Sequence, residues 1–252
     1  LTRAGMTTKE VREWLARLFN LRVDQVGYAG LKDKNAQATQ TFSLWGVSEV
    51  DAAAQVEAVL SVRVLRVARH RNKLKPGHLL GNRFQVLVAQ PEVDALVKTQ
   101  AILSALQERG LPNFFGPQRF GQGGLNLLRG REALLGKGPR DHWLRSFLVS
   151  AYQAHLFNRY LTRRIERNLF HRLLMGDVAK KTDTGGLFDV EDWQVEQPRF
   201  ERGEITFTGP MFGAKMRPAK ADAGALEQEV LAEAGIPPEA FRRQGVQGTR
   251  RP

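Results

Sequence analysis

The residues best placed to do chemistry form one short polar loop, 27–36, with the sequence GYAGLKDKNA. A small apolar run leads into this loop, and a glycine breaks the run. Asp33 follows between Lys32 and Lys34, whose ammonium groups favour an ionised carboxylate. A carboxylate held at the end of a strand by a glycine turn can act as a nucleophile or a general base. An exposed type I turn uses the same residue types, so the loop by itself leaves both interpretations open.

The composition is that of a globular protein with a strong basic excess. Of 252 residues, 42% are hydrophobic and 25% charged, which suits one large domain or two modest ones. The 38 lysines and arginines against 26 acidic residues give a formal net charge of +12, and such a charge indicates a polyanionic partner, usually nucleic acid. Part of the excess is a local stripe without any acidic residue between Glu57 and Glu92. Its basic residues are Arg63, Arg66, Arg69, Arg71, Lys73, Lys75 and Arg83.

Several classes of chemistry are excluded or disfavoured. The chain contains no cysteine, so disulfides, thiolate zinc ligands and thiol nucleophiles are all excluded. The five histidines lack metal-binding spacing and the carboxylates form no dense cluster, so we expect no metal site. No apolar stretch approaches the roughly 20 residues of a spanning helix, and no signal-peptide pattern is present at the start. We therefore expect a cytoplasmic protein without a membrane partner.

Helices and strands around the polar loop predict an α+β layer. A capping box at Thr7 and Glu10 marks the start of the first helix, and Gly110 marks the end of a later one. From the spacing of apolar residues we expect this first helix to include Val11, Trp14, Leu15 and Leu18, and we expect further helices over 50–60, 91–108, 140–167 and 223–234. We expect strands just before the loop and over 39–44, 62–69 and 84–89. Their alternation over the first 110 residues is typical of an α+β fold.

The long helix expected over 140–167 carries two kinds of residue. Its buried stripe is predicted to contain Trp143, Phe147, Tyr152, Leu156, Tyr160 and Leu161. Its last turns are basic, which suits a helix C-terminus; these residues either contact phosphate or face solvent. They are Arg159, Arg163, Arg164 and Arg167.

Three separated stretches together resemble the TruD family of tRNA pseudouridine synthases. They are GYAGLKDKNA around Asp33, RHRNKLKPGHLLGNRF ending at Phe84, and LPNFFGPQRFGQGG starting at Leu111. SAYQAHLFNRYL from Ser150 and the final GTRRP add to the likeness. The resemblance spans essentially the whole chain, and three ordered motifs of this length are far more specific than a lone glycine pattern.

The resemblance implies a fold as well as a family. A pseudouridine-synthase-type catalytic domain, with a mixed, mainly antiparallel sheet flanked by helices, would be interrupted by an inserted α+β domain. On this pattern the catalytic domain covers 1–110, the insertion covers 111–248, and 249–252 return to the catalytic domain. Both ends look short against the family pattern, so we expect the N- and C-terminal strands of the catalytic sheet to be missing from this chain. Such a sheet would have open edges and fewer supports for its active site.

The resemblance further implies an isomerase that converts uridine 13 in the D-arm of tRNA to pseudouridine, without cofactor or metal. Asp33 matches the catalytic aspartate, which either attacks the ribose or removes a ribose proton so that the C1′–N1 bond breaks. Asn82 matches the family's asparagine near the aspartate, and Phe84 matches its active-site phenylalanine, a wall for the everted base. Two residues apart at the start of a strand, Asn82 and Phe84 would share one face.

Contacts to the tRNA backbone are expected from basic side chains near these motifs. The candidates are Lys32, Lys34, Arg69, Arg71, Lys73 and Arg119. The aromatic residues Phe114, Phe115 and Phe120 are expected to form a hinge core between the domains. Three alternatives stay open: a non-catalytic RNA-binding module, an inactive fragment of the enzyme, and an assembly protein that binds an acidic protein. The pattern says nothing about subunit number, and a monomer is the default expectation.

Overall fold

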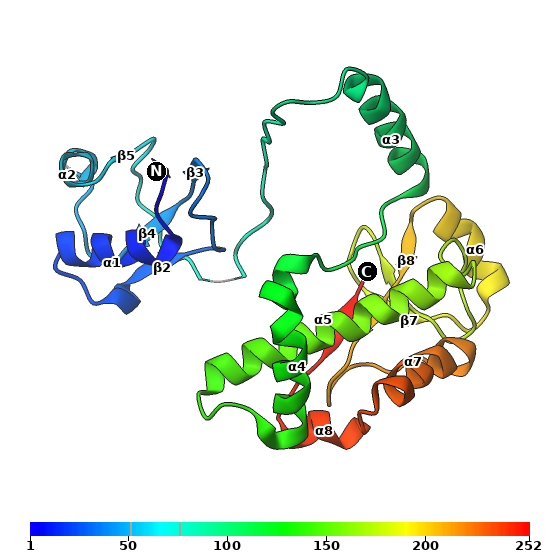
Figure 1. Cartoon of the computed structure of the whole chain (residues 1–252). Coiled ribbons are helices and arrows are strands. Elements are labelled where there is room, and N and C mark those ends of the chain that lie inside the picture. Colours follow the sequence, from blue (N-terminus) through cyan, green and yellow to red (C-terminus); the bar gives the residue numbers. More distant parts are fainter. Residues whose placement is uncertain (51, 76) are drawn as a thin grey trace. The chain divides into compact units, whose positions relative to one another are not determined.

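The computed structural model describes residues 1–50, 52–75 and 77–252. These residues form two compact units, unit 1 (Leu1–Glu92) and unit 2 (Val93–Pro252), and Figure 1 labels most of their helices and several of their strands. Helices are mixed with strands, and every strand pair among the described residues is antiparallel, which confirms the predicted α+β class. No helix among them is long and apolar enough to cross a membrane.

Unit 1 contains two small sheets. In the first, β1 (Thr2–Arg3) lies between β3 (Ala38–Thr39) and β5 (Val62–Arg63). In the second, β2 (Val26–Tyr28) pairs with β4 (Phe42–Leu44). The loop with the candidate aspartate therefore connects one sheet to the other, leaving β2 and entering β3.

Helix α1 (Thr8–Leu18) provides the main apolar face of unit 1, and α2 (Ala52–Val59) packs into the same core. The predicted capping box is confirmed. The Thr7 hydroxyl accepts from the Glu10 backbone N–H at 3.1 Å, and the Glu10 carboxylate accepts from the Thr7 N–H at 2.6 Å. The turn η1 (Val23–Gln25) follows. The buried side chains of this core are Val11, Leu15, Ala16, Val26, Val56 and Leu60.

Two strands expected from the sequence are wrong. Strand β5 ends at Arg63, so most of the predicted strand over 62–69 is irregular, and residues 84–89 form no strand at all. Val86 and Leu87 are 77% and 93% exposed. None of the described strands lies alongside this segment, and a strand without a ladder partner leaves its backbone groups unbonded. The shared face inferred for Asn82 and Phe84 from strand geometry therefore does not apply.

Unit 2 is arranged around one long helix, α5 (His142–Glu166), which Figure 1 shows with α4 and α7 beside it. This helix confirms the expected one over 140–167. The other helices of unit 2 are α3 (Ala95–Arg109), α4 (Leu125–Glu132), α6 (Trp193–Glu201), α7 (Ala221–Ala234) and α8 (Pro238–Arg243). Shorter turns are η2 (Pro117–Phe120), η3 (Gln122–Gly124) and the π-helical η4 (Ala133–Lys137).

Two sheets complete unit 2. In the first, β6 (Val178–Lys181) lies between β7 (Leu187–Asp189) and β8 (Ile205–Phe207). In the second, β9 (Gly209–Met211) pairs with β10 (Thr249–Arg251). The compact units divide after Glu92. The assignment of 1–110, 111–248 and 249–252 to a catalytic and an inserted domain stays a prediction, because compactness does not report which part performs chemistry.

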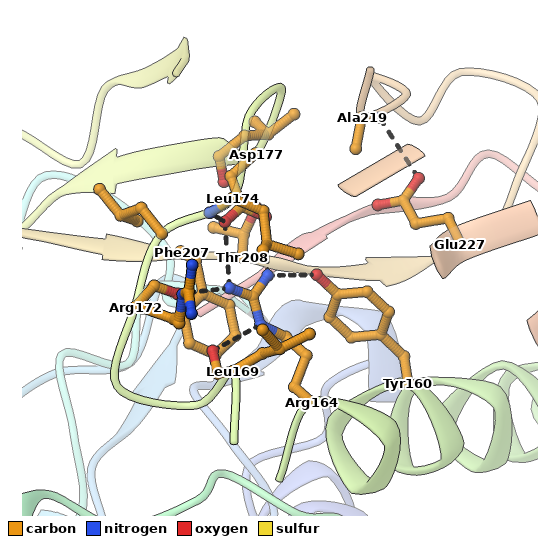
Figure 2. Close-up of polar contacts among 12 residues, drawn as sticks. Tyr160, Arg164, Leu169, Arg172, Leu174, Asp177, Phe207, Thr208, Ala219 and Glu227 are labelled. Carbon is orange, nitrogen blue, oxygen red and sulfur yellow. Dashed lines mark hydrogen bonds and ion pairs between the residues drawn. The ribbon is translucent and has the colours of Figure 1, made fainter. Parts of the chain in front are cut away.

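The basic end of α5 differs from both interpretations of the sequence. Arg164 is fully buried and forms two bonds to the Asp177 carboxylate, at 2.7 and 3.1 Å, as Figure 2 shows. Its guanidinium also donates to the Tyr160 hydroxyl at 2.9 Å and lies 3.8 Å from the centre of the Phe207 ring. Arg159, Arg163 and Arg167, the remaining basic residues of these turns, form ion pairs with Glu229 or Glu233 on α7. These arginines therefore join parts of unit 2 to one another.

The predicted buried stripe of α5 is largely confirmed. Tyr152, Leu156, Tyr160 and Leu161 are buried in the core of unit 2. Phe147 is only half-buried, and Trp143 is 72% exposed near the start of the helix. Helical periodicity identified the correct face, but the layer that covers this face does not extend to the first turn.

Candidate active site

The Asp33 loop is fixed at its back by two buried polar side chains. The backbone N–H of Lys32 donates to the Thr8 hydroxyl at 2.9 Å, and the Gln40 amide donates to the Gly30 carbonyl at 2.8 Å. The Thr8 hydroxyl in turn donates to Gln40 Oε1 at 3.0 Å. Gly30 has a φ of +71°, which favours glycine, and a Cβ there would lie 2.7 Å from the Leu79 side chain. The loop backbone is thus held on both sides of its glycine turn.

A buried cation lies behind these two residues. Arg3 is only 2% exposed, and its guanidinium donates to the Thr8 hydroxyl at 3.0 Å, to Gln40 Oε1 at 3.4 Å and to the Met6 carbonyl. Its Nε has no hydrogen-bond partner, and no carboxylate of the described residues forms an ion pair with it. Burial lowers the pKa of Arg3, and the charge of Glu10 offsets part of that effect. The polar support of the loop therefore carries a positive charge.

The Asp33 side chain itself is exposed to solvent. Within the described part of the chain, it takes part in no hydrogen bond or ion pair. Both neighbouring ammonium groups are engaged elsewhere: Lys32 Nζ donates to Asn82 Oδ1 at 2.6 Å, and Lys34 Nζ lies 3.3 Å from Glu10 Oε1. A carboxylate that is to attack or deprotonate a substrate must be free to approach it. The geometry of Asp33 meets this requirement.

The structure brings one predicted partner of Asp33 to the loop. The bond from Lys32 to Asn82, together with the contact of Leu79 with Gly30, places 79–82 against the residues next to Asp33. Phe84 is 76% exposed and has no ring partner among the described residues. Such a ring is available to a base. The roles of Asn82 and Phe84 stay predictions.

The basic residues after β5 differ in their availability. Arg69 lies 3.8 Å from Glu49 Oε1 in an exposed ion pair, which is a weak interaction. Arg71 is exposed and has no partner in the described part of unit 1. Lys73 donates to the Asp24 carbonyl and thereby fixes its own segment beside β2. Of the three, Arg71 is the most available to a phosphate.

In unit 2, the predicted RNA contact Arg119 lies near the Phe115 ring, with its guanidinium carbon 6.0 Å from the ring centre. Phe115 is the centre of a second cluster of polar and aromatic residues. The backbone N–H and C=O of Phe115 both bond to the Asn158 side chain, each at 2.9 Å. Arg251 stacks on the Phe115 ring at 3.8 Å and donates to Asn113 Oδ1 at 2.7 Å. Motifs separated by more than 100 residues thus meet at one ring. Sequence reasoning missed Asn158 and Arg251, although both lie in the weaker motifs that it noted.

A mainly apolar cavity of about 190 Å³ adjoins this cluster in unit 2. Its walls include Phe157, Tyr160 and Phe207, and Asn113 and Arg251 supply polar groups. Phe115 packs edge-on against Phe157, with ring centres 5.7 Å apart, and so belongs to the core of unit 2. Among the described residues, no group of three or more His, Asp or Glu side chains could hold a metal ion.

Comparison with known proteins identifies the family. A sequence model described as "tRNA pseudouridine synthase D (TruD)" matches residues 1–137 and 140–252. The chain therefore belongs to the TruD family of tRNA pseudouridine synthases, which are isomerases. This confirms the resemblance that the three sequence motifs carried.

Individual relatives agree. The chain is 46% identical over 256 residues to tRNA pseudouridine synthase D of Anaeromyxobacter sp. (strain Fw109-5), covering 98% of this chain and 72% of that protein. It is 44% identical over 253 residues to tRNA pseudouridine synthase D of Thermus thermophilus, covering 100% and 70%. A crystal structure from Methanosarcina mazei, described as a candidate TruD, superposes with a TM-score of 0.69 at 21% identity, over 99% of this chain and 76% of that one. The last match shows a shared fold.

Proposed function

We propose that this chain isomerises uridine 13 of tRNA to pseudouridine, with Asp33 as the catalytic carboxylate. One observation carries the proposal. In a chain that matches the TruD family over residues 1–137 and 140–252, the carboxylate of the first motif is exposed and has no partner among the described residues, while the backbone beside it is fixed by Thr8 and Gln40. A nucleophile or general base requires a backbone in a fixed position and a side chain that is free to contact the substrate.

The proposed reaction begins with the carboxylate facing the ribose of an everted uridine. Asp33 either forms a bond to the ribose or removes a proton from it, and in both routes the C1′–N1 bond breaks. The freed uracil then turns and a bond forms between C1′ and C5, and the bond between Asp33 and the ribose breaks or the removed proton returns to the ribose, so the carboxylate is regenerated. The C5 proton is lost and N1 gains one, so the product is an isomer of the substrate and no co-reactant is consumed. Asn82 would fix groups near the aspartate, and Phe84 would cover one face of the base.

The charge distribution supports an RNA substrate. The stripe between Glu57 and Glu92 contains seven basic residues and no acidic one, and the net charge of the chain is +12. Lys32, Lys34 and Arg71 provide exposed or half-exposed ammonium and guanidinium groups beside or following the loop. Polyanions are attracted by such a surface. In this proposal, 1–110 and 249–252 act as the catalytic domain, 111–248 as the inserted one, and the protein works as a cytoplasmic monomer.

The experiment that tests the proposal uses an unmodified tRNA transcript with U13 and a matched transcript with C13. After incubation with this chain, pseudouridine is labelled chemically and located by mass spectrometry. The proposal expects pseudouridine at position 13 of the first transcript and none in the second. Tight binding of both transcripts without any pseudouridine would instead establish a non-catalytic RNA-binding module. Conversion at another position would overturn the site assignment while leaving the reaction type intact.

A further inference from the structure

A row of alternating rings and guanidinium groups crosses unit 2. At its outer end, Trp143 and Phe147 stack one turn apart on α5, with ring centres 5.6 Å apart and planes 9° from parallel. The Arg119 guanidinium carbon lies 5.7 Å from the centre of the Phe147 ring. An aromatic ring attracts a cation at this distance.

The row continues inward through Phe115. The Arg119 guanidinium carbon lies 6.0 Å from the centre of this ring, and that of Arg251 lies 3.8 Å from it and 5.3 Å from the Phe157 ring. We call the complete row the aromatic–arginine ladder. It consists of Trp143, Phe147, Arg119, Phe115, Arg251 and Phe157.

One face of α5 holds the ladder in place. Positions 143, 147, 150 and 158 follow the helical repeat, so their side chains lie along one side of the helix. The Ser150 hydroxyl accepts from Arg119 Nη2 at 2.7 Å, and the Asn158 amide bonds both backbone groups of Phe115. These bonds fix the positions of the arginine and the ring between two turns of the same helix.

Neither of the two ladder arginines forms an ion pair with a carboxylate of the described residues. Nε of Arg119 and of Arg251 is buried and lacks a hydrogen-bond partner, and Nη1 of each bonds to no described residue. Burial lowers the pKa of Arg119. Burial and the nearby charge of Arg119 lower the pKa of Arg251. Two like charges held near one ring would be stabilised by an anion.

The outer end of the ladder is open. Trp143 is 72% exposed although its ring lies in a stack, so one aromatic face is available at the outer end of the ladder. Surfaces that bind single-stranded nucleic acid combine such rings, on which bases stack, with basic groups that contact the backbone. An apolar protein partner has no anionic groups to pair with the two guanidinium groups, whereas RNA has phosphates, so the charge favours RNA.

We propose that the ladder binds an unpaired segment of the tRNA, with one base stacked on Trp143 and phosphates contacting Arg119 and Arg251. This inference rests on the proposed function for the identity of the RNA. It assigns to unit 2 a contact surface of its own, separate from the chemistry at Asp33.

The test measures the binding of unmodified tRNA to the whole chain. Trp143→Ala is expected to weaken binding by about 5- to 150-fold, because one base–aromatic stack contributes about 1–3 kcal/mol. Trp143→Phe keeps a stacking face and should retain most of the affinity. The matched control is Leu128→Ala on the neighbouring helix α4, which removes an apolar side chain that is 66% exposed and carries no ring; it should bind as the wild type does.

A second measurement isolates the phosphate contacts. Arg119→Gln should reduce the slope of log affinity against log salt by about 0.7–0.9, the value for one phosphate contact. The control Arg202→Gln removes an arginine that is already paired with Glu204 at 2.7 Å and should leave the slope unchanged. Circular dichroism verifies that each variant is folded.

The inference is overturned if Trp143→Ala binds as tightly as the wild type, if Leu128→Ala loses as much affinity as Trp143→Ala, or if Arg119→Gln keeps the full salt slope. Failure of the proposed function gives a different result. A wild-type chain that binds tRNA through the ladder but forms no pseudouridine would leave this inference standing and defeat the proposed reaction.

Discussion

The two units bury arginine side chains in opposite ways. In unit 2, Arg164 faces the buried Asp177 carboxylate, and Arg250 is bonded in the same manner to Glu227. In unit 1, Arg3 is just as enclosed, but it has only a hydroxyl, an amide oxygen and a carbonyl as acceptors. Burial lowers the pKa of Arg164 too, yet the charges of Tyr160 and Asp177 outweigh it and raise the pKa above its ordinary value. The pKa of Arg3 is lowered.

The presence or absence of a carboxylate partner for a buried arginine distinguishes the structural core of unit 2 from the candidate active site of unit 1. Unit 2 pairs its two most deeply buried arginines, Arg164 and Arg250, with carboxylates, which suits a stable framework. In unit 1, the buried Arg3 has no ion-pair partner among the described residues, and it bonds to the same Thr8 hydroxyl that accepts from the Lys32 backbone N–H. A positive charge in a poorly screened environment attracts anions in front of it. The arrangement therefore favours the phosphates of an RNA at this loop.

The largest effect is expected when the scaffold pair is broken. Arg164→Met leaves the buried Asp177 carboxylate without its partner and should lower the free energy of unfolding by about 3–5 kcal/mol. Chemical denaturation followed by circular dichroism measures this loss. The double variant Arg164→Met/Asp177→Leu removes both charges and should recover much of the stability. A double variant as unstable as the single one would show that the ion pair is not what stabilises this core.

Arg3→Met tests the other half of the comparison. This variant leaves no buried carboxylate without a partner, and the acceptors that lose a hydrogen bond are neutral. It should therefore lower the free energy of unfolding by about 1–3 kcal/mol, less than Arg164→Met. The same denaturation experiment compares the two. Equal losses for the two variants would mean that, in the protein in solution, Arg3 is paired with an acidic group as Arg164 is. The proposed difference between the buried arginines of the two units would then be wrong.

Thr8→Val examines how the loop is positioned. The variant removes the acceptor for the Lys32 N–H inside a buried network and should cost about 1–2 kcal/mol. Since a misplaced catalytic group can slow a reaction about 100-fold, single-turnover pseudouridine formation should slow by about 10- to 100-fold. The control is Thr2→Val, whose hydroxyl pairs with that of Thr39 at 2.8 Å and does not contact the loop. If both variants react at the wild-type rate, the Thr8 bond does not position Asp33.

The smallest effect concerns the capping box of α1. The bond from the Thr7 backbone, followed by the Thr7 hydroxyl and Lys34, lowers the pKa of Glu10 to about 2. A lowered pKa means that this carboxylate stabilises the folded state above its ordinary value near 4.5, and that the contribution is lost as the pH falls toward 2. Glu10→Gln should therefore flatten the acid limb of the unfolding curve in this window. Glu13→Gln is the control, and an acid limb identical in Glu10→Gln and wild type would contradict the assignment.

Local signals in the sequence predicted local structure well. The Thr7 and Glu10 capping box marked the start of α1, and apolar spacing over five turns located α5. The strand expected over 84–89 failed because β-preference cannot report whether another strand lies alongside. The position of Asp33 in a loop between strands was predicted from its glycine turn and confirmed.

The supports of the site were not predictable in the same way. Arg3, Thr8 and Gln40 carry no motif, and they meet only because β1 and β3 pair across more than 30 residues. Likewise Arg251 reaches Phe115 from the other end of unit 2. Hydrogen bonds between segments far apart in the chain depend on tertiary packing, which composition and periodicity do not contain.

The most direct test of the account is the Asp33→Asn variant, assayed for pseudouridine in unmodified tRNA while tRNA binding and unfolding are measured on the same sample. Asp24→Asn, which alters an exposed carboxylate paired with Arg22, is the matched control. We expect Asp33→Asn to fold and bind tRNA as the wild type does and to form no pseudouridine, because the Asp33 side chain bonds to none of the residues that the structure describes. Pseudouridine formation by Asp33→Asn at the wild-type rate would show that the chemistry belongs to another group.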